Sequence, residues 1–200
     1  MDGAPRLVPI ALVATAVLVA ADVAAYLVDF GAFQMRIGAL NADSRAGVFQ
    51  WLLLATLGAA AVLAARLASS QPNQRGRLLF LSAALAVLTL AEALHIRDSL
   101  AGLALYALML PLVALLLVNI APDDPARRLM LLGLACLAVS LALHELGPPL
   151  LRALGWDADS WAYQVKIALK ESVAFAGWMF VAWALASRVW PSRTLPAHAT

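Results

Sequence analysis

Long apolar segments alternate with short polar ones along the whole chain, and this pattern predicts a helical membrane protein. About 20 consecutive apolar residues are needed for an α-helix to cross the hydrocarbon core of a bilayer. Segments that meet this requirement lie at residues 7–28, 48–67, 78–96, 100–120, 129–146 and 163–189. We therefore expect an all-α fold, with one polytopic transmembrane bundle of about six helices over residues 1–190 and a flexible tail at 191–200.

Prolines mark the end of the fifth apolar segment. Gly147-Pro148-Pro149 follows it directly, and a glycine followed by prolines is typical of a helix end. The next segment, residues 149–161, mixes leucines and tryptophan with Arg152 and Asp157. This mixture predicts a short amphipathic helix that lies along the membrane surface.

The composition fits a protein covered largely by lipid. Hydrophobic residues make up 64% of the chain and charged residues 13%, whereas about 25% of the residues in a typical soluble domain are charged. The basic residues are scattered through short loops, so the chain has no basic run suited to nucleic acid. The abundance of alanine, leucine and arginine favours a bacterial origin, and the expected location is the bacterial inner (plasma) membrane.

The arginines in the predicted loops are distributed unequally between the two sides of the membrane. Those on the side of the chain termini are Arg6, Arg66, Arg75, Arg77, Arg127, Arg128, Arg188 and Arg193. Those on the other side are Arg36, Arg45, Arg97 and Arg152. Because short cytoplasmic loops carry an excess of Lys and Arg, both termini are predicted to be cytoplasmic.

Ionisable and hydroxyl side chains inside the spans concentrate toward the predicted extracytoplasmic face. A charge at the bilayer centre costs about 2.5–3.5 kcal/mol on insertion scales, so such groups normally face a bundle interior or an aqueous cavity. In the first span, Tyr26 and Asp29 follow Asp22 by four and seven residues, which places the three on one helical face. We expect these residues to share one polar layer: Asp22, Tyr26, Asp29, Glu92, His95, His144, Glu145, Lys166, Lys170 and Glu171.

Part of this layer has the residue types of a metal site. Glu92 and His95 have the Glu-x-x-His spacing that supplies two ligands from one helix in di-iron carboxylate bundles. Together with His144, Glu145 and Glu171 they predict a site for a divalent metal ion, although a second Glu-x-x-His motif is missing. As an alternative, His95 and His144 are suited to serve as axial ligands of one b-type haem.

Other interpretations of the same residues are structural. Lys170 and Glu171 also fit an ion-pair network that fixes helix packing. Ser140 lies on a stripe with Cys136 and His144, but for its hydroxyl we expect a hydrogen bond to a carbonyl of its own helix rather than a role as a nucleophile.

Two short stretches, Leu90–His95 and Leu169–Trp178, carry a resemblance to known sequences. They resemble a set of uncharacterised six-span bacterial membrane proteins, in which one helix ends in an acidic-x-His element and the last helix carries a Glu-rich stretch before a glycine. This chain departs from that pattern, with Lys170 and Phe175 in place of acidic residues. The resemblance implies a six-span membrane fold and no particular activity.

Two hypotheses of different classes follow. In the first, the chain is a small inner-membrane protein whose intramembrane polar pocket, near the extracytoplasmic side, binds a metal ion or handles protons. In the second, it is a non-catalytic accessory or scaffold subunit that assembles with other membrane subunits or with copies of itself. Transport is disfavoured, because spans 48–67 and 100–120 carry almost no polar residues and the two halves of the chain show no inverted repeat. The sequence identifies no catalytic residue.

Overall fold

The computed structural model describes residues 4–37, 39–40, 47–96, 99–120, 125–157 and 159–190. These ranges contain helices and no strand. The elements are α1 (Ala4–Phe33), α2 (Val48–Ser70), the 3₁₀ turn η1 (Pro72–Gln74), α3 (Arg75–Ala93), α4 (Leu100–Ile120), α5 (Pro125–Glu145), α6 (Gly147–Ala153) and α7 (Trp161–Val189). The predicted tail at 191–200 lies outside the described residues.

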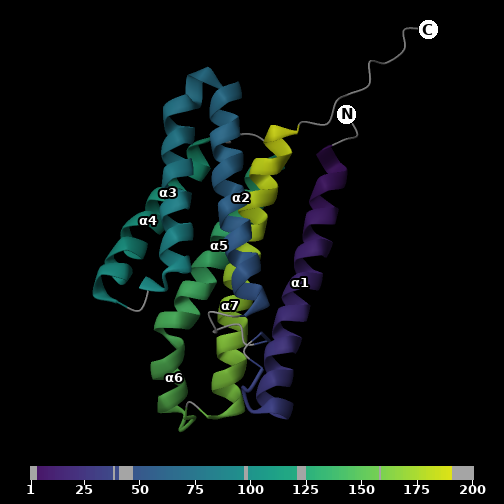
Figure 1. Cartoon of the computed structure of the whole chain (residues 1–200), viewed down its shortest axis with the longest axis vertical. Helices are drawn as coiled ribbons and strands as arrows, with labels where there is room; N and C mark the ends of the chain where they lie inside the picture. The colour runs from purple at the N-terminus through teal and green to yellow at the C-terminus, as the bar shows by residue number, and fades with distance from the viewer. Residues whose placement is uncertain are drawn as a thin grey trace, which may run out of the picture.

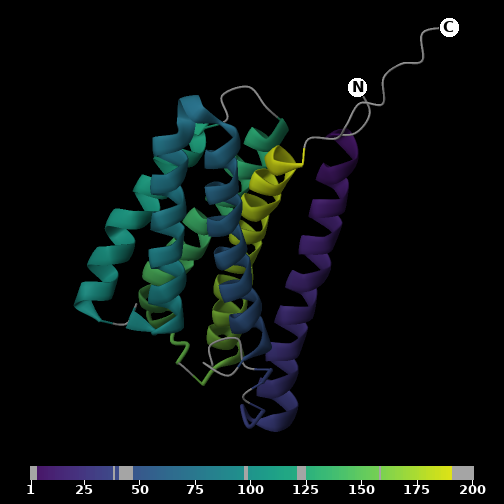
Figure 2. The same ribbon diagram turned by 45° about the horizontal axis from the view of Figure 1, so that its top comes forward.

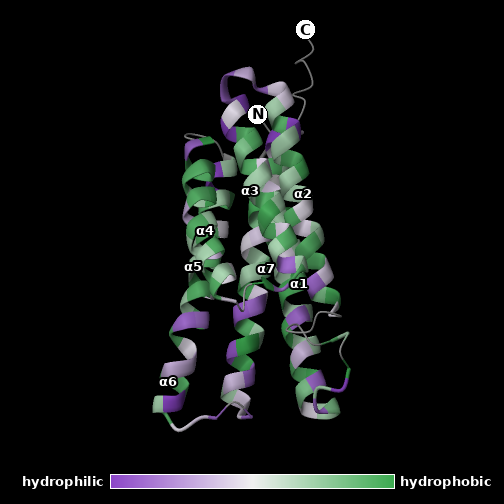
Figure 3. Ribbon diagram, turned by 60° about the vertical axis from the view of Figure 1, so that its left-hand side comes forward, coloured by the Kyte–Doolittle hydropathy of each residue, from purple (hydrophilic) through white to green (hydrophobic). Residues whose placement is uncertain are grey.

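Within these ranges, six helical segments are long and apolar enough to cross a membrane. They are Pro9–Phe33, Val48–Ser70, Pro72–Ala93, Leu100–Ile120, Ala126–Glu145 and Trp161–Val189. The helices run side by side in an elongated bundle (Figures 1 and 2). Hydrophobic residues cover most of their length, and hydrophilic residues gather near the helix ends and in the N-terminal half of α7 (Figure 3). The predicted all-α membrane bundle is therefore confirmed.

Helix α7 is the centre of the bundle, because it packs against α1, α2 and α5. Half of its most hydrophobic stretch is buried, against a third or less in each other described span. Helix α1 lies at one edge of the bundle and α4 at the opposite edge (Figures 1 and 2). Residues that approach α7 are thus the ones that the fold shields from lipid.

Glycines allow the closest helix contact, between α5 and α7. A Cβ atom on Gly133 would lie 2.7 Å from the carbonyl oxygen of Gly177, and one on Gly177 would lie 2.9 Å from the carbonyl oxygen of Gly133. Small residues at such crossings let helix backbones approach closely in membranes. This contact, near the middle of α7, fixes the position of α5 beside α7, whose polar side chains lie in its N-terminal half.

Several helix ends differ from the predicted spans, three of them beside residues of the predicted polar layer. Helix α1 continues to Phe33 rather than ending near residue 28, so Asp29 lies inside it; the Asp29 carboxyl accepts the backbone N–H of Ile37 and holds the chain as it turns back. Helix α3 ends at Ala93 rather than 96, and His95 follows in a left-handed conformation with φ of 52°.

The third difference concerns the prolines after α5. Helix α6 begins at Gly147 and has Pro148 in its first turn, where proline is tolerated because those N–H groups have no partner within the helix. The predicted short helix therefore exists at Gly147–Ala153 instead of 149–161. It continues in roughly the direction of α5 (Figures 1 and 3), so it does not turn across the end of the bundle as a surface helix would.

Candidate functional site

Asp22 is a carboxyl group buried in the middle of a membrane span. Its side chain belongs to α1 and is 1% exposed. Oδ2 accepts a hydrogen bond of 2.6 Å from the Oγ of Ser172 on α7. In the part of the chain that the structure describes, Oδ1 is buried and has no hydrogen-bond partner. A buried polar atom without a partner costs free energy, so a ligand that bonds to Oδ1 would stabilise this site.

The two residues before Ser172 on α7 form a buried ion pair. The Nζ of Lys170 lies 2.5 Å from Oε1 of Glu171, and their side chains are 8% and 12% exposed. The backbone carbonyl of Lys170 also accepts a hydrogen bond of 2.8 Å from the Oγ of Ser140 on α5. The expected bond from Ser140 to its own helix is thus wrong, because the close approach of α5 and α7 offers the hydroxyl a carbonyl on the neighbouring helix.

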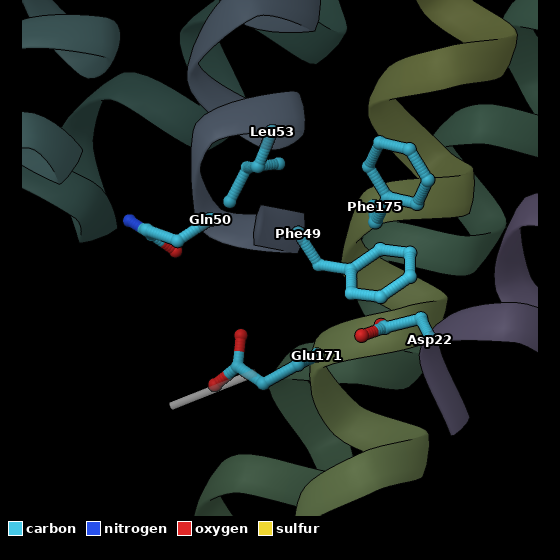
Figure 4. A pocket seen from close by; sticks show the side chains of 6 residues that line it. All are labelled: Asp22, Phe49, Gln50, Leu53, Glu171 and Phe175. Atoms are coloured by element: carbon cyan, nitrogen blue, oxygen red, sulfur yellow. The ribbon is translucent and has the colours of Figure 1, made fainter. Parts of the chain in front are cut away.

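A small pocket joins Asp22 to Glu171 (Figure 4). It is lined by Asp22 from α1, by Phe49, Gln50 and Leu53 from α2, and by Glu171 and Phe175 from α7. In the close-up, the side chains of Asp22 and Glu171 both lie below the ring of Phe49 (Figure 4). The cavity volume is about 10 Å³, roughly the minimum needed for one water molecule. Such a pocket has room for water, a proton or a small ion and excludes an organic substrate.

The pocket lies beside the beginning of α2. Phe49 and Gln50 belong to the first turn of that helix, whose N–H groups carry partial positive charge. Carboxyl groups near a helix N-terminus are favoured electrostatically. Asp22 and Glu171 are therefore placed where a negative charge inside the bundle is least unfavourable.

The rest of the polar face of α1 also meets α7. Tyr26 is buried and its hydroxyl donates a hydrogen bond of 2.7 Å to Oε1 of Gln164. Asp29 is buried one turn further along, and its Oδ2 has no partner among the described residues. Asp22, Tyr26 and Asp29, whose spacing places them on one helical face, are all buried.

The two predicted histidine ligands, His95 and His144, lie at helix ends. His144 is in the last turn of α5, with its Nε2 at 3.8 Å from Oε1 of Glu145; the two side chains are 37% and 59% exposed. His95 lies in the turn after α3, where its Nδ1 is 3.4 Å from the carbonyl oxygen of Ala93. Helix α3 packs against α2 and α4, whereas α5 packs mainly against α7 and α6.

The predicted metal ligands are therefore not brought together as a set. Among the described residues, no group of three or more His, Cys, Asp and Glu side chains is arranged to hold a metal ion. Glu171 is paired with Lys170. A divalent metal bound by Glu92, His95, His144, Glu145 and Glu171, and a haem bound by His95 and His144, stay predictions from the sequence.

Several residues of the site carried no signal in the sequence. Gln50, Gln164 and Ser172 are polar residues of types that often occur in membrane helices, and only their contacts mark them. Span 48–67 carries almost no polar residues, yet Gln50 near its start lines the pocket.

Comparison with known proteins adds no family to this description. Neither a protein-family model, nor a curated protein sequence, nor a solved structure matches the chain. The geometry of Asp22 and its neighbours is thus the basis on which function has to be argued.

Proposed function

We propose that this chain is a small multi-pass protein of the bacterial inner membrane that binds and releases a proton at an intramembrane site centred on Asp22. The observation that carries the proposal is the state of the Asp22 carboxyl group. One oxygen is held by Ser172, and the other is buried without a hydrogen-bond partner in the described structure. A carboxyl group arranged in this way is suited to take a proton on Oδ1.

The charges around the pocket favour a proton over a divalent metal. When Asp22, Glu171 and Lys170 are all ionised, the group carries one excess negative charge, because Lys170 balances Glu171. One proton on Asp22 makes the group neutral, which suits a low-dielectric surrounding. A divalent cation would leave an excess positive charge, and Mg²⁺ or Ca²⁺ needs six or more oxygen ligands.

The neighbouring residues have distinct parts in this function. Ser172 donates to Oδ2 and so leaves Oδ1 to accept the proton. Glu171 is engaged by Lys170, whereas Oδ1 of Asp22 has no hydrogen-bond partner among the described residues, so a proton entering the pocket goes to Asp22. Phe49, Leu53 and Phe175 supply the apolar wall that limits access of bulk water.

Infrared spectroscopy of the full-length protein in lipid bilayers tests this proposal. We expect the difference spectrum between neutral and acidic buffer to contain a carboxylic-acid C=O band that disappears in Asp22→Asn. Glu145→Gln is the matched control, since that side chain is 59% exposed, and it should keep the band. Identical spectra for wild type and Asp22→Asn would refute proton binding at Asp22. If Asp22→Asn instead changed only the oligomeric state, the accessory-subunit hypothesis would be favoured.

A further inference from the structure

The buried face of α1 is polar along most of its length. Within Pro9–Phe33, the buried residues are Ala11, Thr15, Asp22, Tyr26 and Asp29. Thr15, Asp22 and Asp29 follow one another at intervals of seven residues, which keeps them on one side of a helix. Helix α7 is the main neighbour of α1. The seam between these two helices thus contains polar groups where a packed membrane interface usually has small or apolar ones.

Each of the three residues of this heptad series has a buried oxygen atom without a hydrogen-bond partner in the described structure. The atoms are Oγ1 of Thr15, Oδ1 of Asp22 and Oδ2 of Asp29. Buried polar atoms in folded proteins nearly always have a partner, which is often an ordered water. The two carboxyl atoms, on Asp22 and Asp29, point to a ligand that moves along this part of the seam, and the narrow pocket at Asp22 limits that ligand to water and protons.

Polar side chains continue along the seam from Asp22 in one direction only. Between Asp22 and Asp29 lies Tyr26, whose hydroxyl bonds to Gln164; Gln164 is partly exposed and so reaches the surface of the bundle. Between Asp22 and Thr15, by contrast, Leu18 and Val19 pack against the hydrophobic core. Polar groups therefore lead from Asp22 toward the end of α1 at Phe33 and are interrupted toward its beginning.

We propose that this part of the α1–α7 seam is a one-sided proton path to Asp22. The inference rests on the proton binding proposed above and adds the route by which the proton arrives. Water beside the partly exposed Gln164 delivers the proton to Asp29 at the membrane face where α1 ends. Tyr26 relays it by passing its hydroxyl proton toward Asp22 and taking a proton from the Asp29 side, since a phenol can donate and accept at once. Leu18 and Val19 close the opposite direction. The titratable groups facing Asp22 at the end of the path are Glu171 and Lys170 of α7.

The distances along α1 are short enough for this relay. Asp22 and Tyr26 are separated by four residues, or about 6 Å along the helix axis, and Tyr26 and Asp29 by three residues, or about 4.5 Å. One or two water molecules are enough to bridge gaps of this length. Two substitutions interrupt the relay with little change in shape: Tyr26→Phe removes only the hydroxyl, and Asp29→Asn keeps an oxygen to accept the N–H of Ile37.

Time-resolved infrared spectroscopy after a rapid pH jump tests the path with these variants. We expect Tyr26→Phe and Asp29→Asn to slow the appearance of the Asp22 carboxylic-acid band by about tenfold or more, with an unchanged final amplitude. Thr15→Val is the matched control, because it also removes one hydroxyl from the seam but lies beyond Leu18 and Val19; its rate should equal that of wild type.

The outcomes separate the two proposals. A wild-type band with equal rates in all variants would overturn the path and leave proton binding at Asp22 intact. The absence of an Asp22 band from wild type would overturn both. Equal slowing by Thr15→Val and Tyr26→Phe would contradict one-sided access, since the path would then extend past Leu18 and Val19.

Discussion

Replacing Lys170 by methionine should destabilise the protein strongly. The substitution keeps a long unbranched side chain but removes the positive charge that lies 2.5 Å from Glu171. With side chains 8% and 12% exposed, neither partner can turn to bulk water without moving its helix. Removing one member of a buried ion pair typically costs about 3–5 kcal/mol, because the other charge is left buried without compensation. We expect a loss in this range for Lys170→Met.

The double variant Lys170→Met with Glu171→Gln should recover much of that loss. In this variant no charge remains at the pair, and replacing both members of a buried ion pair is often nearly neutral. Glu145→Gln serves as the exposed control, with an expected change within about 0.5 kcal/mol. The measurement is unfolding of the purified full-length protein in mixed micelles with increasing sodium dodecyl sulfate, followed by the fluorescence of its six tryptophans.

The double-mutant cycle decides whether the pair acts as described. A coupling energy close to zero, with both single variants as stable as wild type, would show that Lys170 and Glu171 do not form a buried pair in the folded protein. A double variant as unstable as Lys170→Met would show that Lys170 stabilises the fold through its packing rather than through its charge.

Further substitutions test the helix contact and the hydrogen bond to Asp22. Gly177→Ala should destabilise the protein by about 1–3 kcal/mol, since the added Cβ would lie 2.9 Å from the carbonyl oxygen of Gly133. Gly58 has open space around it, so Gly58→Ala should be neutral or slightly stabilising. Equal effects of the two substitutions in the same unfolding assay would argue against the close contact. Ser172→Ala removes the donor to Oδ2 of Asp22 and should cost about 1.5–3 kcal/mol with ionised Asp22. It should also shift the Asp22 carboxylic-acid band, and an unshifted band would argue against this hydrogen bond.

The histidines show which features of side-chain placement the sequence does not reveal. Depth along each span places His95 and His144 near the same membrane face, but depth says nothing about the direction in which a side chain points. His95 lies after the end of α3 at Ala93 and itself has a left-handed conformation, and the His144 side chain is 37% exposed. Neither feature can be inferred from spans that are apolar on every side, because such spans have no polar face to fix their rotation.

For Asp22, Tyr26 and Asp29, the sequence spacing is more informative. Their spacing places them on one face by helix geometry alone, and all three are buried against the bundle. What the spacing does not reveal is the partner helix. Ser172 and Gln164 are recognised as members of the site only through their hydrogen bonds to α1.

The sequence by itself determined the membrane class and the approximate positions of the spans, because the free energy of burying a segment in lipid is largely a sum over its own residues. Which polar groups meet was decided only by the tertiary structure. The contact of Gly133 with Gly177 sets α5 against α7, and the packing of α1 and α2 on α7 brings Asp22, Gln50 and Glu171 around one pocket. Such contacts depend on the shapes of two or three helices at once, so no single segment of the sequence encodes them.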